Sequence, residues 1–198
     1  MDVLSRKCPL ADDGRYVAMA LSSPVFSSDL RPSFMVAGRL AGEAFEIVAR
    51  PDSRRGIAVD GHVGAENLEL DLFERDGQRW GGGFGLGGSL EFTVTPLEGG
   101  GKRLEGYVGK RLVTLEARNW GQTIHIEGRA GREKVVLNQW NQFDGHMVSG
   151  YIGNKNLSLQ ARRLPGEPGL DPLEYLPLLM RDPESAPIRA ACRLDVVA

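Results

Sequence analysis

The chain has few cysteines and no long apolar run. Its two cysteines, Cys8 and Cys192, lie at opposite ends of the 198-residue sequence. That number and spacing exclude a disulfide framework and paired zinc-ligand motifs, so we expect reduced thiols. No stretch approaches the roughly 18 consecutive apolar residues that a membrane-spanning helix needs, and the N-terminus has no apolar signal core. These absences predict a cytoplasmic protein that does not enter a membrane.

Residue patterns typical of catalysis are also missing. The three histidines, at positions 62, 125 and 146, never occur at metal-ligand spacing. No Gly-x-Ser-x-Gly motif of a serine hydrolase is present. We therefore predict no catalytic residues, no metal and no cofactor, and no motif assigns the chain to a family.

The composition is that of a folded protein. Hydrophobic residues make up 41% of the chain, charged residues make up 25%, and the formal net charge is −2. These values favour one globular domain with additional segments. We expect an N-terminal segment over residues 1–32, a β domain over 33–164, and a Pro-rich tail with a short helix over 165–198.

A repeat dominates the central part of the sequence. Each unit begins with a glycine-containing segment and continues with a run in which apolar and polar residues alternate, as in Leu68–Leu72. Alternation with a period of two predicts strands with one buried face. The units begin at intervals of 21 to 24 residues, at Gly38, Gly61, Gly82, Gly106, Gly128 and Gly150. Two strands in each of six units predict about twelve antiparallel strands in an up-and-down barrel, closed or flattened.

Short hairpin turns set the expected register of these strands. We place two-residue turns at Lys110-Arg111, Trp120-Gly121, Arg132-Glu133, Asp144-Gly145 and Asn154-Lys155. With these turns, apolar residues or glycines face one another almost throughout, and Leu115, Ile126 and Leu137 lie on the inner face. The outer face then carries a row of Glu105, Glu116, His125, Trp140, Ser149 and Gln160. In that row His125 is the cross-strand neighbour of Glu116.

The interior of such a barrel needs filling. Eight strands give roughly the size that side chains alone can fill, and twelve give a wider one. Asp171-Pro172-Leu173-Glu174 is typical of a helix start, with an N-cap, a first-position Pro and an acidic third residue. The apolar segment that follows is predicted either to plug the barrel or to lie outside it as a strap. A parallel β-solenoid is the alternative architecture, because a period near 22 residues suits one coil.

Charge is distributed unevenly along the repeat. Residues 41–100 have a net charge of −6, and residues 101–165 have a net charge of +6 with tyrosines and tryptophans among them. Basic residues interleaved with aromatic rings are typical of surfaces that bind single-stranded nucleic acid. We therefore predict a non-catalytic binding module for a polyanion, with nucleic acid the leading candidate. The predicted binding residues are Lys110, Arg118, Arg129, Arg132, Trp140, Tyr107, Tyr151, Asn138 and His125.

Two other functions remain open. The halves of opposite charge could join copies head to tail, which would make the chain a structural or self-assembling homo-oligomer. A barrel could also hold an enzyme site or a small ligand inside or at its mouth. Charged residues on strands often do no more than face solvent, so the charge pattern alone does not decide among these functions.

Overall fold

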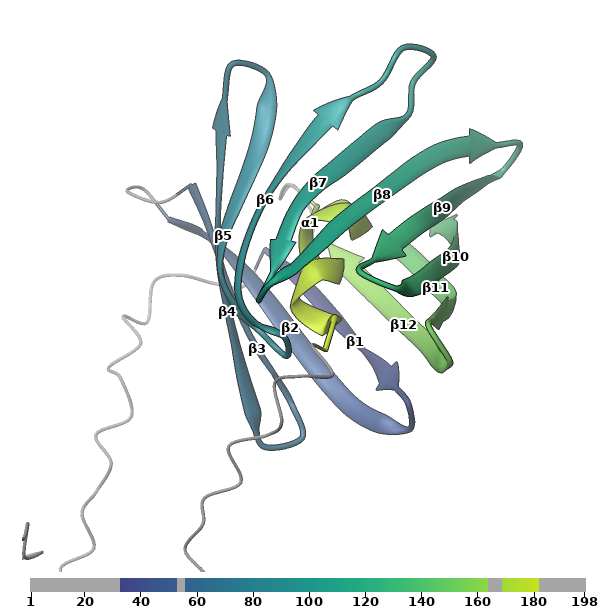
Figure 1. The fold of residues 1–198 in the computed structure, drawn as a ribbon. Helices are drawn as coiled ribbons and strands as arrows, with labels where there is room; N and C mark the ends of the chain where they lie inside the picture. Colours follow the sequence, from purple (N-terminus) through teal and green to yellow (C-terminus); the bar gives the residue numbers. More distant parts are fainter. Residues whose placement is uncertain (1–32, 53–55, 164–168, 182–198) are drawn as a thin grey trace, which may run out of the picture. The chain divides into compact units, whose positions relative to one another are not determined.

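Alternating apolar side chains fold the repeat into twelve antiparallel strands (Figure 1). The computed structural model describes residues 33–52, 56–163 and 169–181. The chain divides into two units, Met1–Leu30 and Arg31–Ala198, and all described residues belong to the second. The predicted segment 1–32 therefore lies outside the described residues. The strands are β1 (Phe34–Leu40), β2 (Glu43–Asp52), β3 (Gly56–Val63), β4 (Glu66–Arg75), β5 (Gln78–Gly85), β6 (Gly88–Pro96), β7 (Lys102–Val108), β8 (Arg111–Trp120), β9 (Thr123–Ala130), β10 (Glu133–Gln142), β11 (Gly145–Ile152) and β12 (Lys155–Arg163).

The strands form a closed up-and-down barrel. Each pairs with its neighbours in the sequence, and β1 pairs with β12 to close the ring. The barrel prediction is confirmed, and the solenoid is excluded because every pairing is antiparallel. The connections β1–β2, β3–β4, β5–β6, β7–β8, β9–β10 and β11–β12 lie at one end, which we call the lower mouth. The other connections lie at the upper mouth, at the top of Figure 1.

The inner face of the barrel is the one that the sequence pattern predicted. Leu115, Ile126 and Leu137 are completely buried on adjacent strands. Polar residues such as Glu105 and Glu127 alternate with them on the exposed face. Burial of the apolar face contributes roughly 25 cal/mol for each Å² removed from water, so this face is the main source of stability.

The predicted register is wrong by two residues at five hairpins. The two-residue turns are Gly109-Lys110, Gly121-Gln122, Gly131-Arg132, Phe143-Asp144 and Gly153-Asn154. Four of them have a glycine with positive φ at the first turn position, the pattern of a type II′ turn. Moving a turn by one residue shifts the pairing by two, which leaves every side chain on the same face. The faces were therefore predicted correctly although the cross-strand partners were not.

A column of inward glycines lets neighbouring strands approach closely. A Cβ atom on Gly83 would lie 2.1 Å from the carbonyl oxygen of Glu69 on β4, and Gly38, Gly61, Gly106, Gly128 and Gly150 show the same contact at 2.0 to 2.5 Å. The sequence pattern placed Gly82 in this column. The structure places Gly83 there instead, because Gly82 lies on the outer face. Glycines at such places allow the sharp strand bends of a barrel.

The C-terminal segment occupies the barrel interior (Figure 1). It consists of α1 (Pro172–Tyr175) and the 3-10 helix η1 (Leu176–Leu179). We call residues 170–180 the plug. Its residues other than Asp171, from Leu170 to Met180, are buried. Figure 1 shows the two short helices along the barrel axis, so the segment is a plug and not an outer strap. No helix among the described residues is long and apolar enough to cross a membrane.

Short sequence motifs determine where the two helices of the plug begin. The Asp171 side chain accepts a hydrogen bond from the amide of Leu173 at 3.0 Å, and Glu174 accepts one from the amide of Asp171 at 2.9 Å. This is the predicted capping box. Pro177 falls in the first turn of η1, where its missing N–H leaves no intrahelical hydrogen bond unmade.

Polar contacts hold the plug at both mouths. At the upper mouth Glu174 lies 3.0 Å from Arg79, Asp171 lies 2.8 Å from Lys102, and the Tyr175 hydroxyl lies 2.8 Å from Nε2 of His146. At the lower mouth the amide of Leu86 donates to the carbonyl of Leu178. The plug therefore runs through the barrel from the upper mouth to the lower one.

The glycine column predicts a large difference between two adjacent substitutions. Gly83→Ala should lower the free energy of unfolding by about 1–3 kcal/mol, because the new methyl meets backbone that cannot move freely. Gly82→Ala should change it by no more than ~0.5 kcal/mol, because the nearest atom to its Cβ would be 3.9 Å away. Urea unfolding of the two variants measures the difference, and equal effects would contradict the close approach.

The buried His146 predicts a loss of stability in mild acid. Burial lowers the pKa of His146 below the ordinary 6.5, so the unfolded chain binds this proton more tightly than the folded chain does. Its contribution to stability is complete above pH 6.5 and is lost as the pH falls through the lowered pKa. Denaturant unfolding at about pH 7.5 and about pH 5.5 should show a smaller acid loss for His146→Gln than for the wild type. The exposed His62→Gln is the control, and a variant with the full wild-type loss would contradict the assignment to His146.

Candidate polyanion-binding surface

The nine predicted binding residues lie on or beside the outer surface of β7–β11, but in two groups. Five lie toward the lower mouth: Tyr107, Lys110, Arg129, Arg132 and Tyr151. Four lie toward the upper mouth: Arg118, His125, Asn138 and Trp140. Arg129 and Thr123 are six residues apart on β9, and Trp140 lies opposite Thr123, so Arg129 and Trp140 are ~20 Å apart at the rise of a strand. Tyr151 pairs with Val136, two residues from Asn138 on β10, so it lies between these two ends of the wall. The structure therefore brings the residues onto one wall without making them one compact site.

The lower group contains cations that have no counter-ion. Arg129 and Lys134 are direct cross-strand partners on β9 and β10. Lys110 and Arg132 lie in the β7–β8 and β9–β10 turns. The Gly131 amide of the second turn donates to the carbonyl of Leu112 on β8 at 2.8 Å, which holds that turn beside the first hairpin. Among the described residues none of these four has an ion-pair partner. We call Lys110, Arg129, Arg132 and Lys134 the cation cluster.

Other cations of the +6 segment are neutralised within the barrel. Glu133 lies 2.9 Å from Arg111 and 4.0 Å from Lys155, and Asp171 binds Lys102. The segment charge therefore overstates the charge available to a partner. Within the described part of the chain the cation cluster keeps its charge unpaired, as do Arg162 and Arg163 at the end of β12. Lys134 was missing from the predicted residues, because only the correct register shows that it lies opposite Arg129.

The upper group is part of an exposed apolar surface. Trp120 and Trp140 both lie opposite Thr123, on either side of β9. Their side chains are 72% and 43% exposed. Phe143 in the next turn and Met147 on β11 are also exposed. We call Trp120, Trp140, Phe143 and Met147 the tryptophan patch.

Sequence reasoning missed Trp120 because it placed this residue in a turn. It is the last residue of β8, and the turn begins at Gly121. An exposed tryptophan on a strand is unusual because so much of its apolar ring stays in water. Two of them on alternate strands mark this wall as different from an ordinary solvated face.

His125 connects the tryptophan patch to its polar surroundings. Its Nδ1 lies 3.0 Å from Oδ1 of Asn138, and Nε2 lies 3.7 Å from Glu127. Its ring meets the edge of Trp120 with the centroids 5.5 Å apart. The predicted pairing of His125 with Glu116 is wrong, because the two-residue shift puts Arg118 opposite His125.

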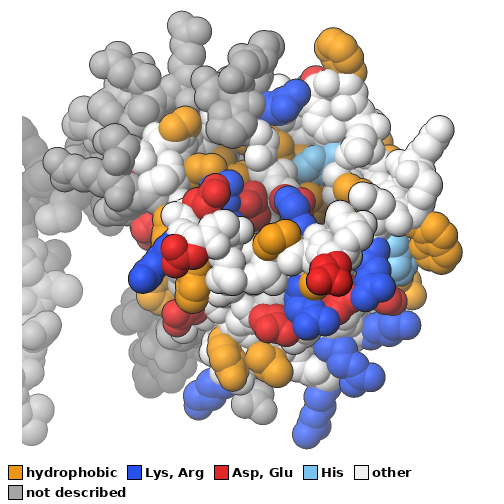
Figure 2. Space-filling view, turned by 90° about the horizontal axis from the view of Figure 1, so that it is seen from above, with side chains coloured by type: hydrophobic (Ala, Val, Ile, Leu, Met, Phe, Trp, Pro, Cys, Tyr) orange, Lys and Arg blue, Asp and Glu red, His pale blue; other side chains and the backbone are white. Residues whose placement is uncertain are grey.

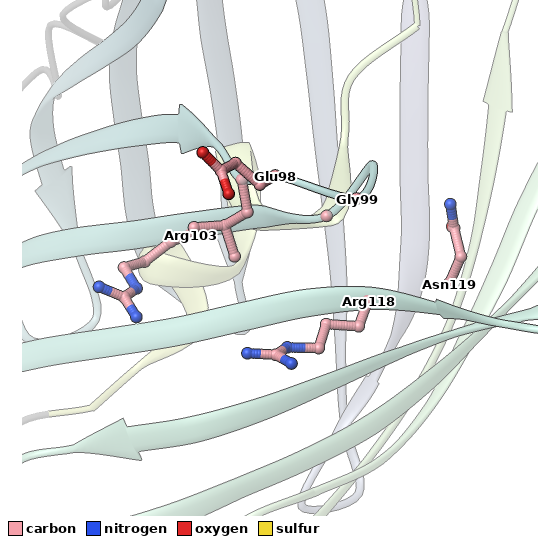
Figure 3. Close-up of a pocket in the computed structure, with 7 residues that line it drawn as sticks. Glu98, Gly99, Arg103, Arg118 and Asn119 are labelled. Atoms are coloured by element: carbon pink, nitrogen blue, oxygen red, sulfur yellow. The ribbon is translucent and has the colours of Figure 1, made fainter.

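Glu116 instead holds Arg103 and Arg118, and these two arginines line a surface hollow (Figure 3). Nε of Arg103 and Nε of Arg118 donate to its two oxygens at 3.0 and 3.1 Å. These hydrogen bonds, first from Arg103 and then from Arg118, lower the pKa of Glu116. The hollow has a volume of about 490 Å³ and lies between β8 and the β6–β7 loop. Figure 3 shows both guanidinium groups pointing to the same side, below Glu98.

The upper mouth itself is mixed in charge. Figure 2 looks down on it and shows acidic and basic side chains around its centre, with Lys and Arg gathered on one flank. Two ion pairs of the plug, Glu174–Arg79 and Asp171–Lys102, lie at this mouth. Burial raises the pKa of Glu174 although Arg79 acts in the opposite direction. These groups are committed to holding the plug, so they do not form an open ligand site.

Comparisons with known proteins give no further guide to function. No protein-family model, no curated protein and no solved structure matches the chain. Function must therefore be argued from the surface itself.

The geometry of the tryptophan patch predicts which tryptophan contributes most of the fluorescence that a quencher in solution can reach. The chain has three tryptophans, and Trp120 is the most exposed of them. Trp120→Phe should therefore remove more acrylamide-quenchable emission than Trp140→Phe does. A quenching constant unchanged by Trp120→Phe would show that the ring is covered in solution.

Proposed function

We propose that the chain is a non-catalytic module that binds single-stranded nucleic acid along the outer wall of β8–β10. The observation that carries this proposal is that Arg129 and Lys134 lie directly opposite each other and have no counter-ion in the described part of the chain. Like charges directly opposite on a sheet destabilise it. An anion placed between them removes that cost, so the cluster favours a ligand that carries negative charge.

A polyanion fits the cation cluster better than a single small anion does. The four cations lie on two adjacent hairpins and not in one pocket. Phosphates spaced along a chain can meet them in turn, and each contact releases condensed counter-ions. Such binding weakens steeply with salt, which gives the proposal a measurable signature.

The tryptophan patch adds the contact that distinguishes single strands from other polyanions. Unpaired bases stack on exposed rings, and each stack contributes about 1–3 kcal/mol. The distance of ~20 Å between the cation cluster and the patch lies along β9, so one extended strand could cross both. Duplex bases are already stacked and could not use the rings.

An internal ligand site has less support. The plug fills the interior, with Leu173, Tyr175, Leu176 and Leu178 completely buried. A ligand could enter only if the plug left, and this would expose its apolar side chains to water. The outer wall needs no such change.

Salt-dependent binding tests the electrostatic part of the proposal. Wild-type protein should bind a labelled oligothymidylate of about 15 nucleotides at about 50 mM salt, and its affinity should fall as salt rises. Arg129→Ala and Lys134→Ala should each reduce the slope of log K against log salt by about 0.7. Arg75→Ala, on the β4–β5 side of the barrel, is the matched control and should leave the slope unchanged. No binding by the wild type at low salt would reject the function.

Stacking is tested separately from charge. Trp120→Ala should weaken binding by an amount equivalent to about 1–3 kcal/mol while the salt slope stays as in the wild type. Phe84→Ala, an exposed aromatic on β5, is the control. If both substitutions have the same effect, the patch does not contact bases.

A further inference from the structure

The wall formed by β2–β6 carries the opposite charge to the cation cluster. Its outer face presents Glu46, Asp60, Glu69 and Glu91 on β2, β3, β4 and β6, and we call these four residues the acidic face. All four are exposed. Glu46, Glu69 and Glu91 have no ion-pair partner among the described residues. This wall therefore offers negative charge that the barrel itself does not neutralise.

The acidic face repeats the arrangement of the cation cluster with the signs reversed. Asp60 and Glu69 are direct cross-strand partners on β3 and β4, as Arg129 and Lys134 are on β9 and β10. Arg50 balances Asp60 at 3.1 Å, but no described cation pairs with Glu69. Because the ladder fixes cross-strand spacing, both pairs have Cβ atoms ~5 Å apart. The two pairs can meet charge against charge.

We propose that the acidic face of one copy docks on the cation cluster of a second copy, so that the chain associates head to tail. The two surfaces cannot meet within one molecule, because β4 and β9 lie on different sides of a closed ring. The twelve described strands leave no free edge, so two copies cannot associate by pairing strands of the barrel. Joining unlike surfaces leaves an unpaired acidic face at one end of the dimer and an unpaired cation cluster at the other, which permits growth beyond a dimer.

Exposed apolar side chains lie beside both charged surfaces. Phe84 is the cross-strand neighbour of Glu69 and is 61% exposed. On the other surface Thr114 is the neighbour of Arg129, and Leu112 lies two residues along β8 and is 53% exposed. Placing Glu69 over Arg129 brings Phe84 near Leu112. Burial of these side chains adds an apolar contribution to the charge attraction.

This inference uses the same cations as the proposed function but does not depend on it. A second copy and a nucleic acid would compete for Arg129 and Lys134, so each should displace the other. Glu69 belongs only to self-association. Substitution of Glu69 therefore separates the two proposals.

Sedimentation velocity tests the association. The wild-type sedimentation coefficient should rise with protein concentration at about 50 mM salt and return to the monomer value at about 500 mM, because salt screens the contact. Glu69→Lys and Arg129→Glu should each give a monomer at low salt. Glu98→Lys changes the net charge as Glu69→Lys does but lies in the β6–β7 loop, so this control should still associate.

A mixture of the two monomeric variants is the decisive measurement. Arg129→Glu keeps its acidic face, and Glu69→Lys keeps its cation cluster. An equimolar mixture should form a heterodimer that grows no further, because each partner has one working surface. Far-UV circular dichroism of the separate variants confirms that both are folded before mixing.

Each other outcome has a defined meaning. A wild type that stays monomeric at low salt overturns the association, and so does a mixture that stays monomeric. Association that Glu98→Lys weakens as strongly as Glu69→Lys does would show a net-charge effect without a docking surface. Nucleic-acid binding retained by Glu69→Lys leaves the proposed function standing in every case.

Discussion

The barrel depends on filling its own interior. Twelve strands enclose more space than their side chains can occupy. An empty apolar interior would forfeit the dispersion contacts that hold a protein core together. The plug supplies the missing atoms with leucines, Tyr175 and Met180. The outer surfaces exist as fixed shapes because this inner packing holds the strands in place.

The pattern of the repeat explains why faces could be predicted from the sequence. Alternation assigns each residue to a side, and an error of two residues keeps that assignment. Leu115 and Ile126 were therefore placed inside correctly, although the expected turns put the strands out of register by two residues. The plug helix was also predictable, because Asp171, Pro172 and Glu174 form a local signal that needs no tertiary information. Whether that helix lay inside or outside the barrel could not follow from local signals.

Details of the surface depended on the register, and these the sequence pattern got wrong. Two turns that begin at Gly109 and Gly131 were predicted to begin one residue later, at Lys110 and Arg132. The turn that begins at Gly121 was predicted to begin one residue earlier, at Trp120. The predicted register therefore paired His125 with Glu116, and it did not place Arg129 opposite Lys134. Ion pairs such as Glu133 with Arg111 were also invisible to a charge count. A binding surface is set by which charges remain unpaired, and this requires knowledge of neighbours.

The path of the plug constrains how the molecule can be made. β12 ends at the upper mouth, the plug runs through the bore, and Arg181 reaches Glu43 and Glu66 at the lower mouth. During translation the ribosome releases all twelve strands before the plug. If the barrel closed first, the plug would have to pass through one of its mouths to reach the interior. The seam between β1 and β12 joins the strands that lie farthest apart in the sequence, and such distant pairings form slowly. An open sheet that wraps around the plug and seals last avoids the threading, and it allows a bulky domain to be fused downstream of Arg181.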